Sequence, residues 1–143
     1  LPVDEMLQHL FGIQTGEEYF LVDTGGGNGI MTQLEKAQIP MEAIHEIFIS
    51  HEHTDHLSGA DLLIRMIATK MKKGQYEGNL YIFCHEDLVD TILTITKLTV
   101  QKKFYQMIGE RIFLAGKDGE AREILGYRVQ FFDIQSTKAK QYG

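Results

Sequence analysis

Four residues of types that bind metal ions lie within six positions of one another, between an apolar stretch and an amphipathic one. They belong to the segment ISHEHTDHLSG and are His51, His53, Asp55 and His56. The stretch before the cluster, AIHEIFIS, is typical of a buried strand. After it, apolar residues recur at helical spacing, at Leu57, Ala60, Leu63, Ile64, Ile67 and Met71. The fold must therefore end a strand and begin a helix at this cluster.

Strand and helix patterns alternate along the rest of the chain. Strands are predicted at Leu10–Gln14, Glu18–Asp23, 43–50, Leu80–Cys84, 111–116 and 125–134. Helices are predicted from residue 29 to Pro40, from Asp55 to about Lys73, and over 85–100, with Asn28 as the cap of the first. The order predicts one α/β domain over residues 1–143, with helices covering a mainly β core.

The spacing of the four clustered residues suits two adjacent metal ions. Imidazole binds zinc, iron or manganese near neutral pH because much of it is unprotonated, and Asp55 adds a charged oxygen ligand. His56 follows Asp55 directly and points away from His51 and His53. We therefore expect His51 and His53 at one ion, and Asp55 and His56 at the other. The isolated histidines His9, His45 and His85 are interpreted as surface residues without a function.

Two metal ions in such a site lower the pKa of a bridging water and hold a developing oxyanion. The predicted reaction is attack by a metal-bound hydroxide on an ester, amide, thioester or phosphodiester. Asp55 would be the catalytic residue, because it would both hold a metal ion and orient the hydroxide.

Composition narrows the class of protein further. The chain is 43% hydrophobic and 24% charged, as in soluble globular proteins, and has no apolar run long enough to span a membrane. The first residues lack a basic stretch followed by an apolar one, so we expect no secretory signal. The single cysteine, Cys84, cannot form an internal disulfide, which favours a reducing, cytoplasmic location. The net charge of −6 argues against nucleic acid as a partner of this fragment.

The cluster and one upstream segment resemble the metallo-β-lactamase superfamily. Its signature His-x-His-x-Asp-His appears as His51-Glu-His53-Thr-Asp55-His56, and FLVDTGGG matches the family's strand ending in Asp-x-Gly at Asp23. The sequence around these motifs is most similar to the ribonuclease Z-like branch of metal-dependent hydrolases. The resemblance implies an αββα sandwich with a two-ion site, zinc by preference and iron or manganese as alternatives, at one edge between two β-sheets.

The resemblance also implies that Asp23 steadies the histidine loop by hydrogen bonding, a role that tunes metal ligands. An aspartate that caps the turn before the glycine run is a compatible interpretation. The chain departs from the family at Gln135, which stands where a further histidine is expected. An amide oxygen is a weaker zinc ligand than imidazole. The family's last aspartate and histidine would lie beyond residue 143, so each ion would keep two strong ligands.

These departures predict the first half of the sandwich, truncated at its C-terminus, with weak metal retention. The uncovered sheet face would bind a missing C-terminal half or a second copy in a homodimer. Two functions remain open. One is a metal-dependent hydrolase of a small-molecule or phosphodiester substrate. The alternative is a truncated or degenerate, non-catalytic relative that acts in assembly or binding. Activity of this chain alone is therefore an open question at the level of sequence.

Overall fold

The computed structural model describes residues 11–24, 29–50 and 54–133. In chain order the elements are β1 (Phe11–Thr15), β2 (Glu18–Val22), α1 (Gly29–Lys36), the 3-10 turn η1 (Met41–Ala43), β3 (Ile44–Phe48), α2 (Thr54–Lys72), β4 (Leu80–Phe83), α3 (Glu86–Thr99), α4 (Lys102–Tyr105), β5 (Ile112–Ala115), β6 (Ala121–Ile124) and β7 (Tyr127–Gln130). The α/β class expected from the alternating patterns is confirmed.

Five strands form one sheet in the order β1-β2-β3-β4-β5. β1 and β2 make an antiparallel hairpin, whereas β2, β3, β4 and β5 run parallel to one another. Parallel neighbours need crossover connections, and α1, α2 and the α3–α4 pair supply them. The carboxyl ends of four consecutive strands therefore meet at one edge of the sheet. The chain reaches that edge at the end of β3, just before the histidine cluster.

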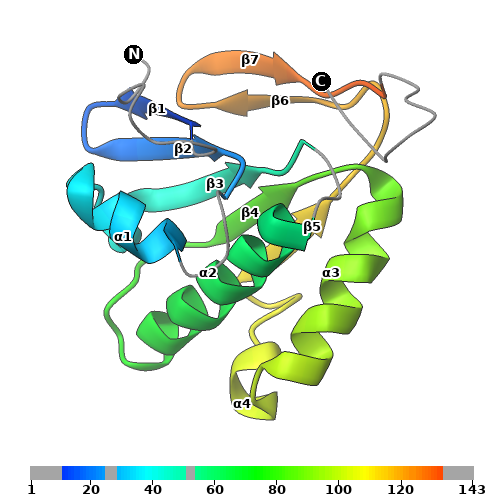
Figure 1. Ribbon diagram of the computed structural model, residues 1–143. Helices are drawn as coiled ribbons and strands as arrows, with labels where there is room; N and C mark the ends of the chain where they lie inside the picture. Colours follow the sequence, from blue (N-terminus) through cyan, green and yellow to red (C-terminus); the bar gives the residue numbers. More distant parts are fainter. Residues whose placement is uncertain (1–10, 25–28, 51–53, 134–143) are drawn as a thin grey trace.

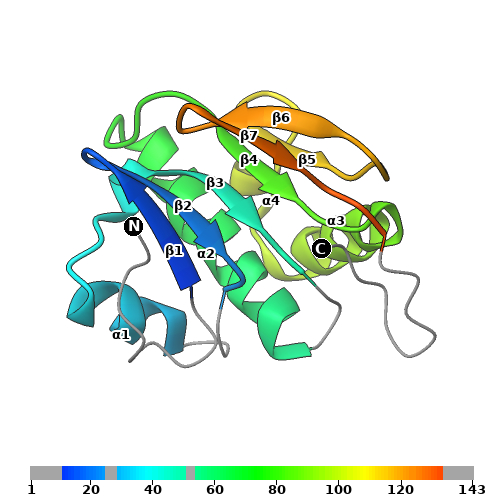
Figure 2. The same cartoon turned by 90° about the horizontal axis from the view of Figure 1, so that it is seen from above.

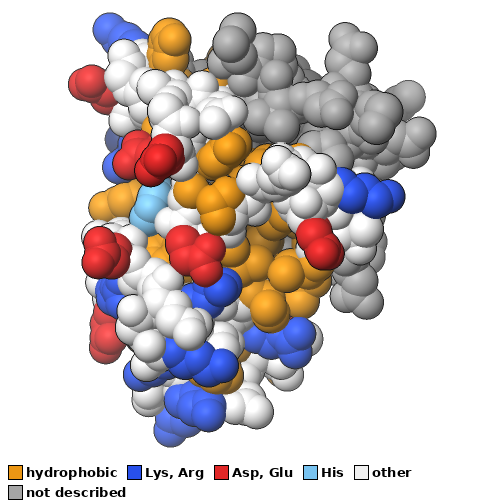
Figure 3. Space-filling model, turned by 90° about the vertical axis from the view of Figure 1, so that its left-hand side faces the viewer, with side chains coloured by type: hydrophobic (Ala, Val, Ile, Leu, Met, Phe, Trp, Pro, Cys, Tyr) orange, Lys and Arg blue, Asp and Glu red, His pale blue; other side chains and the backbone are white. Residues whose placement is uncertain are grey.

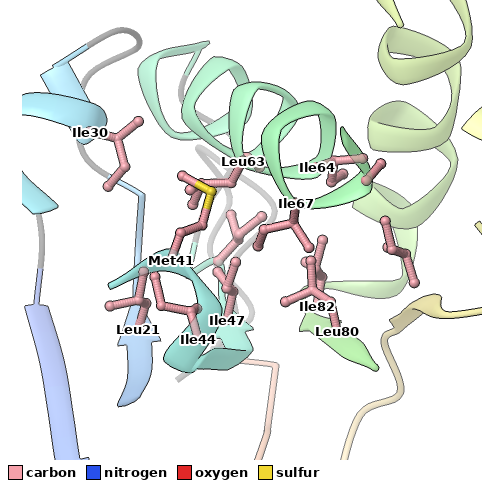
Figure 4. Close-up of a cluster of buried hydrophobic side chains, with 14 of the residues drawn as sticks. Leu21, Ile30, Met41, Ile44, Ile47, Leu63, Ile64, Ile67, Leu80 and Ile82 are labelled. Atoms are coloured by element: carbon pink, nitrogen blue, oxygen red, sulfur yellow. The ribbon is translucent and has the colours of Figure 1, made fainter. Parts of the chain in front are cut away.

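The molecule has three layers (Figures 1 and 2). α1, α2 and α3 cover one face of the five-stranded sheet, and the β6–β7 hairpin crosses the other face over β4 and β5. The helical side holds the larger core, in which isoleucine and leucine side chains of α2 meet those of the strands (Figure 4). The labelled contacts come from Leu63, Ile64 and Ile67 of the helix and from Ile47 and Ile82 of the sheet.

A register shift explains why β3 keeps its apolar residues on the helical side. Tyr19 pairs with Ile44 and Phe20 pairs with Glu46, so the pairing skips His45. Ile44 and Ile47, three residues apart, can therefore both face the helices, although strict alternation would put them on opposite faces. Both side chains are fully buried.

The opposite face of the sheet carries an aromatic cluster. Its buried members are Phe20, Phe48, Phe83, Ile124 and Phe131. The Phe131 ring stacks on Phe83 with centroids 4.9 Å apart and tilts against Phe48 at 5.2 Å. The expectation that this face of the sheet stays uncovered is therefore wrong at the three sheet phenylalanines. A homodimer stays a prediction.

Three local expectations differ from the structure. α1 ends at Lys36 and not at Pro40, because Gln38 takes a left-handed φ of 56° and Pro40 is the N-cap of η1. The segment expected to connect the last two strands contains β6, whose sequence AREI lacks the apolar alternation of a buried strand. α4 has four residues, too few to show helical periodicity. Among the described residues, no helix is both long and apolar enough to cross a membrane.

Candidate metal centre

Backbone hydrogen bonds continue past the ends of the parallel strands and align the edge where the cluster begins. The Asp23 N–H donates to the Phe48 carbonyl at 2.6 Å, and the Ile49 N–H donates to the Phe83 carbonyl at 2.8 Å. The Cys84 N–H donates to the Ala115 carbonyl at 3.2 Å. Four strand ends are thus held in line up to the point where the chain enters the histidine segment.

Asp23 connects the end of β2 to the end of β3 through its side chain. Its carboxylate accepts a hydrogen bond from the Ser50 N–H at 2.8 Å and another from the Ser50 hydroxyl at 2.6 Å. Asp23 has a left-handed φ of 63°, a conformation that aspartate tolerates better than most residues. The residue directly before His51 is therefore fixed at both its backbone and its side chain, as expected of a residue that steadies the loop.

The neighbouring residue, Thr24, fixes the other side of the segment. A β-carbon added at Gly59 of α2 would lie 2.7 Å from both the carbonyl oxygen and the hydroxyl of Thr24. Only glycine permits this approach, so the second turn of α2 packs directly on the residue after Asp23. Asp23 and Thr24 together hold both flanks of residues 51–53: Ser50 before them, and α2, which starts at Thr54, after them.

The structure describes only some of the predicted site residues. The backbones of Asp55 and His56 lie in the first turn of α2, whereas His51, His53 and Gln135 lie outside the described residues. Within residues 11–24, 29–50 and 54–133, no group of three or more histidine, cysteine, aspartate or glutamate side chains could hold a metal ion. The assignment of the four clustered residues as ligands therefore stays a prediction.

The donor chemistry of this part of the chain fits a divalent ion. The segment offers three imidazoles and the Asp55 carboxylate within six positions, and its flanks are fixed by Asp23 and Thr24. Nitrogen and oxygen donors of this kind suit zinc, iron and manganese. Burial raises the pKa of the Cys84 thiol at this edge to about 12, so the free thiol is protonated near neutral pH.

The interpretation of His85 as a functionless surface residue is wrong. Its side chain is buried and caps α3, because Nδ1 accepts a hydrogen bond from the Asp87 N–H at 3.1 Å. Its Nε2 lies 3.1 Å from the Asp133 carboxylate. The position directly after β4 and before the acidic residues Glu86 and Asp87 is a helix-start signal that points to a cap. No local pattern points to the bond with Asp133, 48 residues away.

Two further grooves lie away from the strand-end edge. One is lined by Gln14, Gly16, Glu17, Glu18, Tyr19, Pro40, Glu42, Ala43 and His45, at the starting ends of β2 and β3. The other lies by α1 and α2 and is lined mainly by apolar side chains, among them Met31, Met41 and Met66. Figure 3 shows a face on which hydrophobic side chains gather between acidic and basic ones. Of the described residues on either side of the cluster, neither Ser50 nor Leu57, Ser58 or Gly59 lines these grooves.

Comparisons with known sequences agree with the motif. The family model described as the metallo-β-lactamase superfamily matches residues 9–70, which include Asp23 and the whole cluster. A ribonuclease Z from Phocaeicola vulgatus is 38% identical over 72 residues, which is 50% of this chain and 21% of that relative. Residues 9–70 therefore match the metallo-β-lactamase superfamily, in agreement with the resemblance carried by the motif. The chain's sequence similarity to a ribonuclease Z supports the ribonuclease Z-like branch.

Solved structures show the superfamily fold. A diphosphatase of the PhnP family matches with a TM-score of 0.69 at 18% identity, over 96% of this chain and 48% of that one. The metallo-β-lactamase fold protein YhfI from Bacillus subtilis matches with a TM-score of 0.66 at 19% identity, over 93% of this chain and 48% of that one. The short form of human tRNase Z matches with a TM-score of 0.60 at 21% identity, over 93% of this chain and 54% of that one. The chain spans about half the length of these proteins, which confirms a partial metallo-β-lactamase fold.

Proposed function

We propose that this chain is the metal-binding part of a metal-dependent hydrolase that acts on an ester or phosphodiester. The observation that carries the proposal is the pair of hydrogen bonds from Ser50 to Asp23. They fix the chain one residue before a segment whose residue types are those of a two-ion site. A structural turn needs no such series of histidines, whereas a metal centre needs its ligands oriented by neighbouring groups.

The roles of the residues follow from their chemistry. His51 and His53 would hold one divalent ion, and Asp55 and His56 would hold a second, with zinc as the preferred metal. When bound, two such ions supply a water of lowered pKa and neutralise charge on the substrate oxygen. Asp55 would also orient the attacking water, because its second oxygen can accept a hydrogen bond. Asp23 would orient the histidine segment through Ser50.

Phosphorus–oxygen bonds are the favoured substrate class. Two of the similar proteins are named as a ribonuclease Z and a diphosphatase, and both names refer to cleavage of such bonds. A small-molecule phosphodiester suits this chain better than RNA. The basic residues Lys70 and Lys72 lie in the last turn of α2, and the candidate ligands lie at its start. At 1.5 Å per residue, roughly 25 Å separates them. A cytoplasmic location stays a prediction.

Metal analysis of the purified chain tests the proposal. Atomic emission after mild purification should find zinc, iron or manganese, and H53A should lower the amount bound. The matched control is His45→Gln, at the start of β3 and away from the strand-end edge, where the glutamine amide can still hydrogen bond with the Tyr76 hydroxyl. A metal-free wild-type chain whose stability H53A leaves unchanged would overturn the proposal.

A non-catalytic relative that binds or assembles is the second candidate, and Gln135 favours it. A chain with two strong ligands for each ion would hold metal weakly. The variant Gln135→His separates the two candidates. A gain of metal and of bis(p-nitrophenyl) phosphate hydrolysis favours the hydrolase. Absence of both in wild type and variant favours the non-catalytic alternative.

A further inference from the structure

His85 lies beside the entrance to the histidine segment, on the neighbouring strand. Glu46 pairs with Tyr81, Ile47 with Ile82 and Phe48 with Phe83. The bond from the Ile49 N–H to the Phe83 carbonyl shows that the ladder continues beyond β3. Extrapolated by two residues, this register brings Ser50 and His85 to neighbouring positions just after β3 and β4.

The hydrogen bonds of His85 assign its tautomer. Nδ1 accepts the Asp87 N–H at 3.1 Å and therefore carries no proton. The proton of the neutral ring is then on Nε2, which donates to the Asp133 carboxylate at 3.1 Å. Both nitrogens are used, one within α3 and the other on a distant segment. The ring is 5% exposed, so solvent does not compete freely for these bonds.

Asp133 is held from two directions. Its carboxylate accepts the bond from His85, and its N–H donates to the Asp118 carboxylate at 2.8 Å. Phe131, two residues earlier, is buried between Phe48 and Phe83. The path of the chain is therefore fixed at the strand-end edge, two residues before Gln135. That position is the one where the superfamily pattern calls for a further ligand.

Capping alone does not require this arrangement. Serine, aspartate or asparagine at position 85 would cap α3 at least as well. A histidine adds a second nitrogen that reaches across to Asp133, and it does so without a charge in a buried place. The additional bond connects two segments that are 48 residues apart in the sequence.

We propose that His85 is a positioning residue of the metal centre, acting through Asp133 on the segment that carries Gln135. The proposal rests on the proposed function, because it assumes that a metal binds at residues 51–56. The bond from Nε2 fixes Asp133, two residues before Gln135, and in this role it would direct a donor at position 135 toward the metal. His85 itself touches neither metal nor substrate in this role.

Cobalt titration of the full chain tests the role with matched variants. Co²⁺ reports its own coordination through visible absorption. D133A removes the acceptor, whereas D133N keeps an amide oxygen that can still accept the Nε2 proton. H85N keeps a good cap for α3 and is too short to reach Asp133. We expect D133A and H85N to weaken Co²⁺ binding about 10-fold and to alter the spectrum. D133N should bind Co²⁺ nearly as wild type does.

The outcomes separate this role from the proposed function. Absence of Co²⁺ binding by the wild-type chain overturns the proposed function and with it the positioning role. Wild-type binding that D133A and H85N leave unchanged, in affinity and spectrum, overturns the positioning role alone. Equal loss in D133A and D133N also overturns it, because the hydrogen bond would then not be the cause. Circular dichroism of H85N checks that α3 remains folded.

Discussion

Asp23 has the strongest local constraint at the candidate site. It combines a left-handed backbone with two hydrogen bonds to Ser50. D23A loses both bonds and places alanine in an unfavourable φ, so it should lower the free energy of unfolding by about 2–4 kcal/mol. D23N keeps one acceptor and tolerates the left-handed φ, so its loss should be about 1 kcal/mol. Urea unfolding measures both, and equal losses would contradict this account.

Cys84 directly precedes His85, so the reactivity of its thiol reports whether the strand-end edge is buried. Burial raises the pKa of its thiol from 9.0 to about 12. Only the thiolate reacts, and three pKa units lower its population at pH 8 about 1,000-fold. The folded chain should therefore resist a thiol reagent such as dithionitrobenzoate, and labelling should follow unfolding in urea. Rapid labelling of the folded chain, at the rate of a small thiol, would show that the edge is open.

The local pattern identifies residues that act through their sequence neighbours, and it misses those that act across the fold. Asp23 is predictable because a strand ending in Asp-x-Gly is itself a motif, and its bonds to Ser50 agree with the expected steadying role. His85 is not predictable in the same way. Its cap on α3 has a local signal, but its bond to Asp133 depends on how β4 and the chain after β7 meet. The four proposed ligands remain untested.

At the scale of elements, α2 is placed by its contact with Thr24. Gly59 leaves no room for a side chain there, because an added β-carbon would lie 2.7 Å from a backbone oxygen. Gly59→Ala should lower the free energy of unfolding by about 1–3 kcal/mol, since the helix must shift away. It should also weaken metal binding, because α2 carries Asp55 and His56 in its first turn.

Gly29 at the start of α1 is the matched control for that substitution. An added β-carbon there meets no atom of the described residues within 4 Å. Gly29→Ala should leave stability unchanged or raise it by up to about 1 kcal/mol, because alanine restricts the unfolded chain. Thermal unfolding of the two variants side by side makes the comparison. Similar losses in both would mean that close packing on Thr24 is not the cause.

Elements with strong periodicity are predicted well, and elements defined by their partners are not. α2 extends from Thr54 to Lys72 against a predicted Asp55 to about Lys73, because its apolar stripe is continuous. β6 has one buried residue, Ile124, and exists because β7 pairs with it. The register shift at His45 could not be predicted from the sequence either. Ile44 and Ile47 contradict strand alternation, and only the pairing with β2 explains why both face the helices.

At the scale of the whole molecule, Phe131 joins the hairpin to the main sheet. It is 3% exposed and contacts Phe48 and Phe83, whereas the adjacent Phe132 is 53% exposed. Phe131 is therefore part of the core, whereas its neighbour Phe132 is exposed to solvent. Since Asp133 lies two residues further on, the packing of Phe131 also holds the chain where Asp133 can bond to His85.

Phe131→Ala should therefore act on stability and on the proposed centre together. Loss of a buried aromatic ring costs about 3–5 kcal/mol, and the freed hairpin would no longer present Asp133 to His85. Phe132→Ala should change the free energy of unfolding by no more than about 0.5 kcal/mol, because its ring already contacts water. Urea unfolding measures both free energies. Resistance of residues 121–133 to proteolysis reports the hairpin separately, and it should fall in the Phe131 variant alone. Equal effects of the two substitutions would mean that the aromatic cluster does not hold the hairpin to the sheet, and the link from the hairpin to His85 would then need another cause.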